Sequence, residues 1–339
     1  MAENLIPTGH IVTVFGGSGF IGRQVVRKLA KRGWRIRVGT RRPDLAFHLQ
    51  PSGRVGQIHA VQANLRNPAS VARALHGSQA VVNLVGILAE SGRQNFEAVH
   101  AFGARAVARA AQEAGISRLV HMSAIGADPD SPSEYARSKA RGEAAVRDII
   151  PDAIVTRPSI VFGPEDDFFN RFAAMARVLP VFPLIGAETK FEPVFVGDVA
   201  EVIARGVDGE LPAGSTWELG GPEIRSLREL VVYVCAVTRR KRLLLPVPFG
   251  PGHYMALGTE IATILSLGMF PKMLAATRDQ VALLARDNVV SAEAIKAGRT
   301  LKALGIQPET VGAVVPAYLY RYRKTGQYAD ERLTPTPTL

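Results

Sequence analysis

The sequence predicts an α/β protein built on a doubly wound parallel sheet, with a smaller α+β lobe toward the C-terminus. Three observations support this prediction. Short β-branched runs alternate with amphipathic helical segments through the first half of the chain, which is typical of βαβ units. A glycine-rich turn joins the first strand to the first helix, and prolines and glycines interrupt the alternation after Pro158.

The expected elements follow this alternation in order. Strands are predicted at 10–15, 34–40, 57–62, 80–85, 118–123 and 153–157. Helices are predicted between them at 20–32, 68–76, 95–114 and 134–149. Gly33 and Gly115 directly follow two of these helices, as glycines often do at helix ends.

A change in composition near Pro158 divides the chain. We expect a first domain over residues 1–157 and a smaller lobe over 158–325. Residues 194–220 are a candidate segment for strands that return to the first domain. The tail 326–339 contains the low-complexity run LTPTPTL and is expected to be disordered. The lobe is expected to hold helices at 168–178, 198–207, 226–238, 271–286 and 309–323.

The charge balance narrows the classes of ligand. The 339 residues carry 41 Lys and Arg against 30 Asp and Glu, a net charge of +11. This excess favours a phosphate-bearing ligand, an acidic partner surface or anionic lipid. Nucleic acid is disfavoured, because no recognition module with interleaved aromatic residues is present. Cys235 is the only cysteine and lies in the apolar run VVYVCAV, so we expect a core position and a reducing compartment.

The sequence also bears on membranes. The first residues, MAENLIPTGH, contain neither an apolar signal core nor an arginine-rich presequence. The most apolar segment, 261–270, is far shorter than the roughly 20 residues that a spanning helix needs. We therefore expect no transmembrane segment and a cytoplasmic chain.

The turn after the first strand reads Gly16-x-x-Gly19-x-x-Gly22 within VFGGSGFIG. Glycines permit a sharp turn, a close approach of backbone amides to a pyrophosphate, and close packing of the helix on the strand. The first amides of the helix then face that anion. The position between strand and helix predicts a Rossmann-type dinucleotide site. The expected cofactor contacts in this turn are Gly16, Gly17, Ser18, Gly19, Phe20, Ile21 and Gly22.

The end of the second strand distinguishes between cofactors. Sites for NADH generally place an acid there to accept from the ribose 2′-hydroxyl. This chain instead has Arg41 and Arg42, and residues 23–42 hold nine Arg or Lys and no acid. Guanidinium groups bind a 2′-phosphate through charge-assisted hydrogen bonds, so the sequence predicts NADPH. Asn64, after the third strand, either bonds the adenine or forms a turn.

A serine, a tyrosine and a lysine suggest carbonyl chemistry. Ser123 ends a strand, and Tyr135 and Lys139 open the next helix with the i, i+4 spacing that places them on one face. There Lys139 is expected to hold the nicotinamide ribose and to lower the pKa of the phenol, which makes Tyr135 a proton donor or acceptor. Ser123 is expected to polarise a substrate carbonyl.

These features resemble the short-chain dehydrogenase/reductase superfamily, in its extended or atypical branch. The likeness rests on GGSGFIG, the Ser–Tyr–Lys set and RPSIVFGPED, and covers roughly residues 10–200. More narrowly, NLVGIL, SAIGAD and SEYARSKARGE, with the region of the glycine turn, are similar to the NDUFA9-type accessory subunits of respiratory complex I. The resemblance implies a tightly bound NADPH, with Val85, Gly86 and Pro158 as further contacts.

The same resemblance implies partners and a location. The partners are other complex I subunits of the peripheral arm, and the location is the cytoplasmic face of a bacterial inner membrane, where the arm meets the membrane. The nearly uncharged stretch 243–275 is either core of the lobe, the lining of a lipophilic pocket, or a surface that faces partner subunits or the bilayer. In the last case the basic run 239–242 would lie near anionic lipid headgroups.

Two departures from the enzyme pattern argue against turnover. Extended enzymes commonly have Asn-x-x-Gly-Thr where this chain has His100-Ala-Phe-Gly103-Ala104, and a second hydroxyl where it has Ala124. His100 either relays a proton or packs under the cofactor. Three functions remain open: an NADPH-holding subunit with a vestigial catalytic set, a free-standing NADPH-dependent reductase or epimerase/dehydratase of a nucleotide sugar or lipid-like carbonyl, and an NADPH/NADP⁺ sensor.

Other polar residues have structural interpretations. Glu165-Asp166-Asp167 is expected to be a solvated turn that leads into the helix at 168–178, and no metal site is expected. His121, in the middle of a strand, is expected to be packed. Asp198 is expected to cap its helix.

Overall fold

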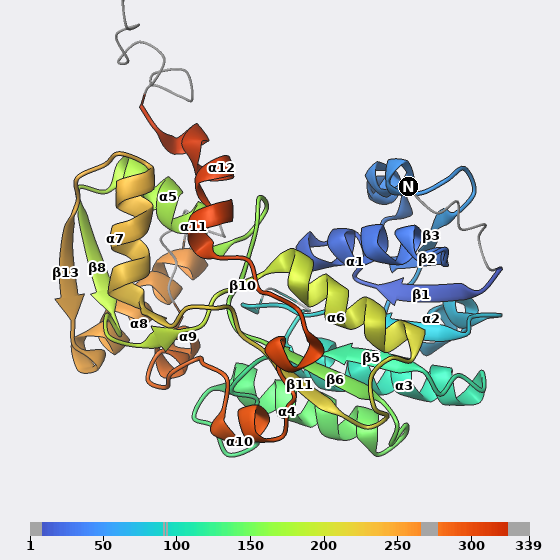
Figure 1. Ribbon diagram of the computed structural model, residues 1–339. Helices are drawn as coiled ribbons and strands as arrows, with labels where there is room; N and C mark the ends of the chain where they lie inside the picture. The colour runs from blue at the N-terminus through green and yellow to red at the C-terminus, as the bar shows by residue number, and fades with distance from the viewer. Residues whose placement is uncertain (1–8, 91, 93, 266–276, 325–339) are drawn as a thin grey trace, which may run out of the picture. The chain divides into compact units, whose positions relative to one another are not determined.

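The computed structural model describes residues 9–90, 92, 94–265 and 277–324, which form two compact units (Figure 1). The first unit comprises the chain to Ser159, Val196–Gly220 and Val290–Pro308. The second comprises Ile160–Phe195, Gly221–Val289 and the chain from Glu309. The chain therefore leaves the first unit and returns to it twice.

The first unit is built on a seven-stranded parallel sheet in the order β11-β6-β5-β4-β1-β2-β3. The sequence order reverses between β1 and β4, which makes a topological switch point at the carboxyl ends of these strands. The predicted fold class, a doubly wound parallel sheet, is confirmed. The strands are β1 (Ile11–Phe15), β2 (Arg35–Thr40), β3 (Ile58–Gln62), β4 (Ala80–Asn83), β5 (Leu119–Met122), β6 (Ile154–Pro158) and β11 (Thr216–Leu219).

Helices cover both faces of this sheet (Figure 1). One face carries α1 (Phe20–Lys31) and α6 (Val196–Asp208); the other carries α2 (Pro68–Leu75), α3 (Phe102–Glu113) and α4 (Glu134–Arg147). An ionic cluster joins α1 to α6, in which the guanidinium of Arg32 binds both Glu201 and Asp208.

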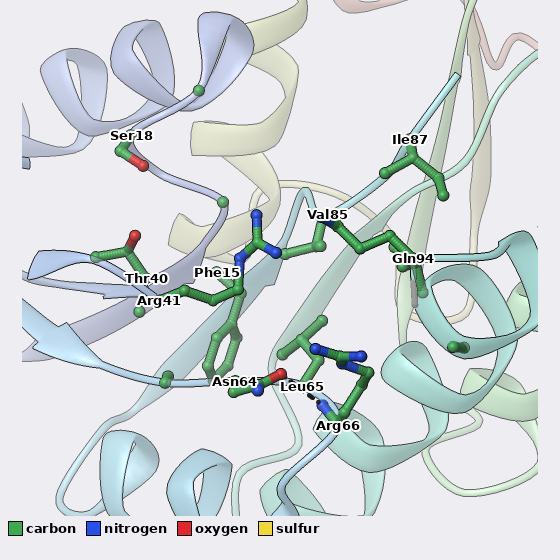
Figure 2. Close-up of a pocket in the computed structure, with 16 residues that line it drawn as sticks. Phe15, Ser18, Thr40, Arg41, Asn64, Leu65, Arg66, Val85, Ile87 and Gln94 are labelled. Carbon is green, nitrogen blue, oxygen red and sulfur yellow. Dashed lines mark hydrogen bonds between the residues drawn. The ribbon is translucent and has the colours of Figure 1, made fainter. Parts of the chain in front are cut away.

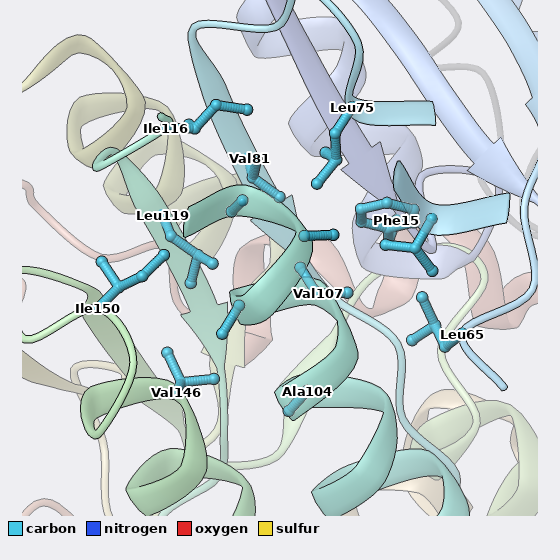
Figure 3. Packing of buried hydrophobic residues seen from close by; sticks show 14 of the residues in the cluster. Phe15, Leu65, Leu75, Val81, Ala104, Val107, Ile116, Leu119, Val146 and Ile150 are labelled. Carbon is cyan, nitrogen blue, oxygen red and sulfur yellow. The ribbon is translucent and has the colours of Figure 1, made fainter. Parts of the chain in front are cut away.

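An apolar core lies between the sheet and α2, α3 and α4 (Figure 3). Phe15 of β1, Val81 of β4 and Leu119 of β5 face small residues of α3 such as Ala104, which allow the helix to approach closely. Each fully buried Val or Leu side chain stabilises the fold by about 1.5–3 kcal/mol. This packing holds the carboxyl ends of the strands in register.

Two local features were not predicted from the pattern. Residues 43–52 form a 3₁₀ helix, η1 (Pro43–Ser52). The helix predicted at 95–114 begins with a π-helical turn, η2 (Glu97–Ala101), before α3. Single π-helical turns of this kind are rare and often lie at functional sites, and η2 carries His100.

Two later segments complete the first unit. β11 pairs with β6 at the edge of the sheet. Residues 290–308 contain α10 (Ala292–Lys296) and η3 (Lys302–Leu304). The backbone N–H of Ser291 donates to Glu218 of β11 at 2.8 Å, and Arg205 of α6 donates to the carbonyl of Leu304 at 2.8 Å.

Over its described residues, the second unit contains three two-stranded sheets and helices of different lengths. The strand pairs are β7 (Val161–Phe162) with β10 (Val194–Phe195), β9 (Lys190–Phe191) with β12 (Arg225–Ser226), and β8 (Val181–Ile185) with β13 (Leu243–Val247). The helices are α5 (Phe168–Val178), α7 (Leu227–Val237), α8 (Phe249–Leu265), α9 (Arg278–Leu283), α11 (Val311–Val314), α12 (Pro316–Leu319) and η4 (Tyr320–Tyr322). Its core includes Cys235, as predicted, and burial raises the pKa of that thiol.

The prediction of a solvated turn at Glu165-Asp166-Asp167 is wrong for Asp166. This carboxylate is buried and accepts hydrogen bonds from the hydroxyl of Tyr318 and the backbone N–H of Asn170. It therefore fastens α12 to the loop that precedes α5. Among the described residues, no cluster of His, Cys, Asp and Glu has the arrangement of a metal site.

Several predicted segments fall partly or wholly outside the described residues. Of the helix predicted at 271–286, residues 278–283 are helical, and 271–276 lie outside the described residues. The apolar stretch 243–275 forms β13 and α8 up to residue 265, and the tail 326–339 lies outside as well. No helix in the described part of the chain has the length and apolar character needed to cross a membrane.

Replacing Gly22 by alanine is expected to destabilise the first unit. A Cβ atom at this position would lie 2.2 Å from the carbonyl oxygen of Gly16, so the turn would have to move. Overpacking of this kind costs about 1–3 kcal/mol, which denaturant unfolding followed by tryptophan fluorescence would measure. Gly258→Ala in α8 is the control, because a Cβ there meets nothing within 4 Å. Equal unfolding midpoints for Gly22→Ala and wild type would contradict this account.

Candidate functional site

The turn between β1 and α1 has the geometry of an anion site. Gly16 lies in the left-handed region with φ 80°, and its carbonyl accepts from the N–H of Gly19 at 3.1 Å. Gly19 begins α1 without a side-chain cap, and the first turn of the helix contains no acid. The first amides of α1 are therefore left for a phosphate, which the helix dipole also favours.

A cavity of about 240 Å³ opens beside this turn (Figure 2). Its walls come from the turn itself, from the ends of β2 and β3, from the segment after β4 and from η2. The described residues of the lining include two arginines and no Asp or Glu, so the cavity favours an anion. The lining residues are Phe15, Gly16, Ser18, Gly19, Gly39, Thr40, Arg41, Ala63, Asn64, Leu65, Arg66, Val85, Ile87, Gln94, Ala98 and Val99.

The two arginines at the end of β2 have different environments. Arg41 lines the cavity. Arg42 is not part of the lining, and its guanidinium donates to both carboxylate oxygens of Asp44, at 3.1 and 2.9 Å. The hydrogen bond from Arg42 lowers the pKa of Asp44. The structure therefore brings one guanidinium of the predicted pair to the cavity and pairs the other with a neighbouring acid.

Asn64 forms the turn that the sequence left as one of two alternatives, and its contact with the adenine stays a prediction. Its Oδ1 accepts from the backbone N–H of Arg66 at 3.1 Å, which makes a turn after β3. The same residue lines the cavity.

Ser123, Tyr135 and Lys139 are positioned by the end of β5 and the start of α4. Ser133 caps α4 by accepting from the N–H of Ala136, and this fixes where the helix begins. The Nζ atom of Lys139 lies 5.9 Å from the centroid of the Tyr135 ring. Ser123 is 2 % exposed, and its hydroxyl has no hydrogen-bond partner among the described residues. A buried hydroxyl of this kind can bond a water, a substrate or a cofactor atom.

The ammonium of Lys139 is held in a nearly dry position. The residue is 4 % exposed, and Nζ donates to the carbonyl of Met122 at 3.4 Å. Burial lowers the pKa of Lys139 to about 8, and the carboxylate of Glu143 opposes this shift. That carboxylate is engaged by the guanidinium of Arg157, at 2.9 and 2.7 Å. A Cβ on Gly86, in the segment after β4, would lie 3.2 Å from Nζ, so a side chain there would press on the ammonium.

His100 is buried within η2. Its Nε2 accepts from the backbone N–H of Ile87 at 3.0 Å, so the ring proton lies on Nδ1, which is 2.8 Å from the hydroxyl of Ser138. Ser138 in turn donates to the carbonyl of Tyr135 at 2.7 Å. Burial, followed by the charge of Lys139, lowers the pKa of His100 to about 3. Both ring nitrogens are engaged, which favours the packed role over the relay.

His121 is packed, as predicted. It is 3 % exposed in β5, its Nδ1 lies 3.2 Å from the side-chain amide nitrogen of Asn83, and burial lowers its pKa to about 3. Two neutral histidines therefore surround Lys139 without supplying a counter-charge.

These residues fit a nicotinamide dinucleotide. The uncapped helix start and the acid-free cavity suit the phosphates and adenosine, and the buried Ser123 hydroxyl, Tyr135 and Lys139 suit the nicotinamide end. Residues 16–154 of the chain match the NAD(P)H-binding family.

The relatives identify the family more narrowly. The NADH-ubiquinone oxidoreductase 40 kDa subunit of Neurospora crassa mitochondria is 31% identical over 320 residues, which are 94% of this chain and 81% of that protein. The chain belongs to the family of this 40 kDa subunit. The resemblance to NDUFA9-type, atypical short-chain dehydrogenases/reductases is thereby confirmed.

The chain is also similar to two enzymes. A ceramide reductase of Caulobacter vibrioides is 34% identical over 190 residues, which are 56% of this chain and 58% of the enzyme. The NADPH-dependent quinone oxidoreductase of Escherichia coli, in its complex with NADPH, has a TM-score of 0.70 at 20% identity, covering 91% of this chain and 99% of the enzyme. The second similarity concerns the fold alone.

The cofactor-binding and catalytic residues that the sequence predicts in this chain divide into two sets. Gly16, Ser18, Gly19, Arg41, Asn64 and Val85 line the cavity. Those outside the lining are Gly17, Phe20, Ile21, Gly22, Arg42, Gly86, Ser123, Tyr135, Lys139 and Pro158. Sequence reasoning missed Arg66, although it follows Asn64 at a strand end. Ala98 and Val99 were also missed, because no local pattern signals the π-helical turn that places them.

The buried lysine predicts a dependence of stability on pH. The pKa of Lys139 falls from 10.5 to about 8 on folding, so the unfolded chain binds more protons between these values. The contribution of Lys139 to stability is therefore fully present above pH 10.5 and is lost as the pH falls through 8. We expect the free energy of unfolding of wild type, relative to Lys139→Met, to increase by up to about 3 kcal/mol from neutral pH to pH 10.5.

Urea denaturation of both proteins across this range measures the difference. Lys302→Met is the matched control, because Lys302 is exposed on η3. Parallel pH profiles for wild type and Lys139→Met would contradict the burial of a shifted lysine.

Proposed function

We propose that the chain is an NADPH-binding accessory subunit of respiratory complex I that stabilises the junction of the peripheral arm with the membrane arm. The observation that carries this proposal is the similarity to the 40 kDa subunit across 94% of the chain. Its partners are the other subunits of the peripheral arm, at the cytoplasmic face of a bacterial inner membrane. The nucleotide serves as a tightly held structural ligand.

The choice of NADPH is supported by the charge of the cavity. Arg41 lines it, and the lining residues that the structure describes include no Asp or Glu that would pair with this guanidinium. At the end of β2, the described lining residues include no Asp or Glu that could accept a hydrogen bond from a ribose 2′-hydroxyl. Both features favour a 2′-phosphate.

Contact with anionic lipid headgroups is a further part of the proposal. In the second unit, Leu243 and Leu245 of β13 are 65% and 52% exposed, directly after the basic run 239–242. The guanidiniums of Arg240 and Arg242 donate to main-chain carbonyls, which orient them without neutralising their charge. Apolar side chains beside oriented cations are suited to an anionic membrane surface.

A free-standing reductase of a lipid-like carbonyl is the second candidate. The buried hydroxyl of Ser123, which has no hydrogen-bond partner in the described part of the chain, favours it, as does the similarity to a ceramide reductase. In this reaction Ser123 would donate to the carbonyl oxygen and Tyr135 would transfer its phenolic proton to that oxygen. Lys139 would hold the nicotinamide ribose and stabilise the phenolate that remains. NADPH, when bound, supplies the hydride.

Replacing Tyr135 by phenylalanine distinguishes the two candidates. The change removes the phenolic proton and keeps the ring that packs against His100. Wild type and variant would be purified from native membranes, and their co-migration with complex I and its NADH:ubiquinone activity measured. On the subunit proposal, assembly and activity are expected to be unchanged within about twofold, because the phenol takes no part in them. A protein that runs alone and loses carbonyl reduction with Tyr135→Phe would contradict the proposal.

Arg41 and Arg42 are expected to differ in their effect on cofactor choice. Arg41→Ala should weaken NADPH binding by about tenfold or more and leave NADH within a few-fold, because one charge-assisted contact to the 2′-phosphate is lost. Arg42→Ala should change neither, because Arg42 is paired with Asp44 outside the cavity lining. Fluorescence titration of both nucleotides measures the constants. Equal losses of NADPH and NADH in Arg41→Ala would count against a 2′-phosphate site.

A further inference from the structure

A second arginine lines the cavity from the neighbouring strand. Arg41 follows β2 and Arg66 lies shortly after β3, and these two strands are adjacent and parallel in the sheet. Figure 2 shows both side chains reaching into the cavity region from the ends of their strands. Among the described residues of the lining, Arg41 and Arg66 are the charged ones. The pair of arginines at the cavity is thus Arg41 and Arg66, rather than the sequence neighbours Arg41 and Arg42.

The backbone before Arg66 is held on both sides. Asn64 Oδ1 accepts from the N–H of Arg66 at 3.1 Å, and the N–H of Asn64 donates to Ser70 Oγ at 2.9 Å. The hydroxyl of Ser70 donates back to the carbonyl of Asn64 at 3.1 Å. Leu65, between them, is buried in the core. A backbone that is already ordered lowers the entropic cost of binding through the side chain it carries.

The charge of the cavity indicates what the two guanidiniums would bind. A phosphate monoester carries a charge close to −2 at neutral pH and offers three acceptor oxygens. One guanidinium fork satisfies two of these oxygens, so a second donor is readily accommodated. The alternative, stacking of Arg66 on the adenine ring, would serve NADH and NADPH equally.

We infer that Arg66 is a specificity-determining residue that binds the 2′-phosphate of NADPH together with Arg41. The inference rests on the proposed binding of NADPH and adds to it a residue from a second strand. The phosphate is then held between two strand ends, and cofactor choice depends on both.

Binding titrations on the full chain test this role. NADPH and NADH dissociation constants would be measured for wild type, Arg66→Ala, Arg66→Lys and Arg41→Ala, with Arg42→Ala as the control. Arg66→Ala is expected to weaken NADPH by about tenfold or more and NADH by less than about threefold. Arg66→Lys, which keeps the charge and loses the fork, should fall between wild type and Arg66→Ala. Raising the salt concentration should weaken NADPH binding less in Arg66→Ala than in wild type.

The outcomes separate this inference from the proposed function. Equal weakening of NADPH and NADH in Arg66→Ala would assign Arg66 to the adenine and overturn the inference. NADPH binding at the wild-type level in Arg66→Ala, with a selective loss in Arg41→Ala, would overturn it and leave the NADPH proposal standing. A wild-type chain that prefers NADH would overturn the proposed function itself. Circular dichroism and the partial recovery in Arg66→Lys distinguish a lost contact from a misfolded variant.

Discussion

The close approach of α1 to the turn after β1 is the constraint on which the nucleotide site depends. The helix can lie there because Gly22 presents no side chain to the carbonyl of Gly16. That approach aims the first amides of α1 at the carboxyl edge of the sheet, where the switch point between β1 and β4 also lies. Residues at the ends of β2 and β3 and in η2 complete the cavity beside the first amides of α1.

Behind the site lies a set of buried polar groups that a purely structural core would avoid. Lys139, His100 and His121 are each at most 4 % exposed. Keeping both histidines neutral and the lysine with a depressed pKa is costly, and such groups gather where a protein binds or transforms a ligand. His100 links two segments: it accepts from the N–H of Ile87 and contacts Ser138, which donates to the carbonyl of Tyr135. This chain of hydrogen bonds ties the start of α4 to the segment after β4.

The sequence predicted what local patterns encode, and missed what depends on distant packing. Strands β1 to β6 and helices α1 to α4 follow from periodicity and from the glycine turn, and Tyr135 and Lys139 share a face because helix geometry requires it. The pairing of Arg42 with Asp44, the burial of Asp166 by Tyr318 from far along the chain, and the π-helical turn at Glu97–Ala101 have no such local signal. Arg66 became a candidate only when the sheet placed β3 beside β2.

The position of β11 has a consequence for biosynthesis. This strand covers β6, yet it is separated from it in the chain by Ile160–Phe195 of the second unit and by α6. Residues up to Leu219 must therefore have left the ribosome before β11 can pair with β6. Until then, the unpaired edge of β6 exposes backbone groups that another extended segment could bind. Such long-range pairing slows folding, so the nascent protein should need chaperone protection for longer than a sheet assembled in chain order.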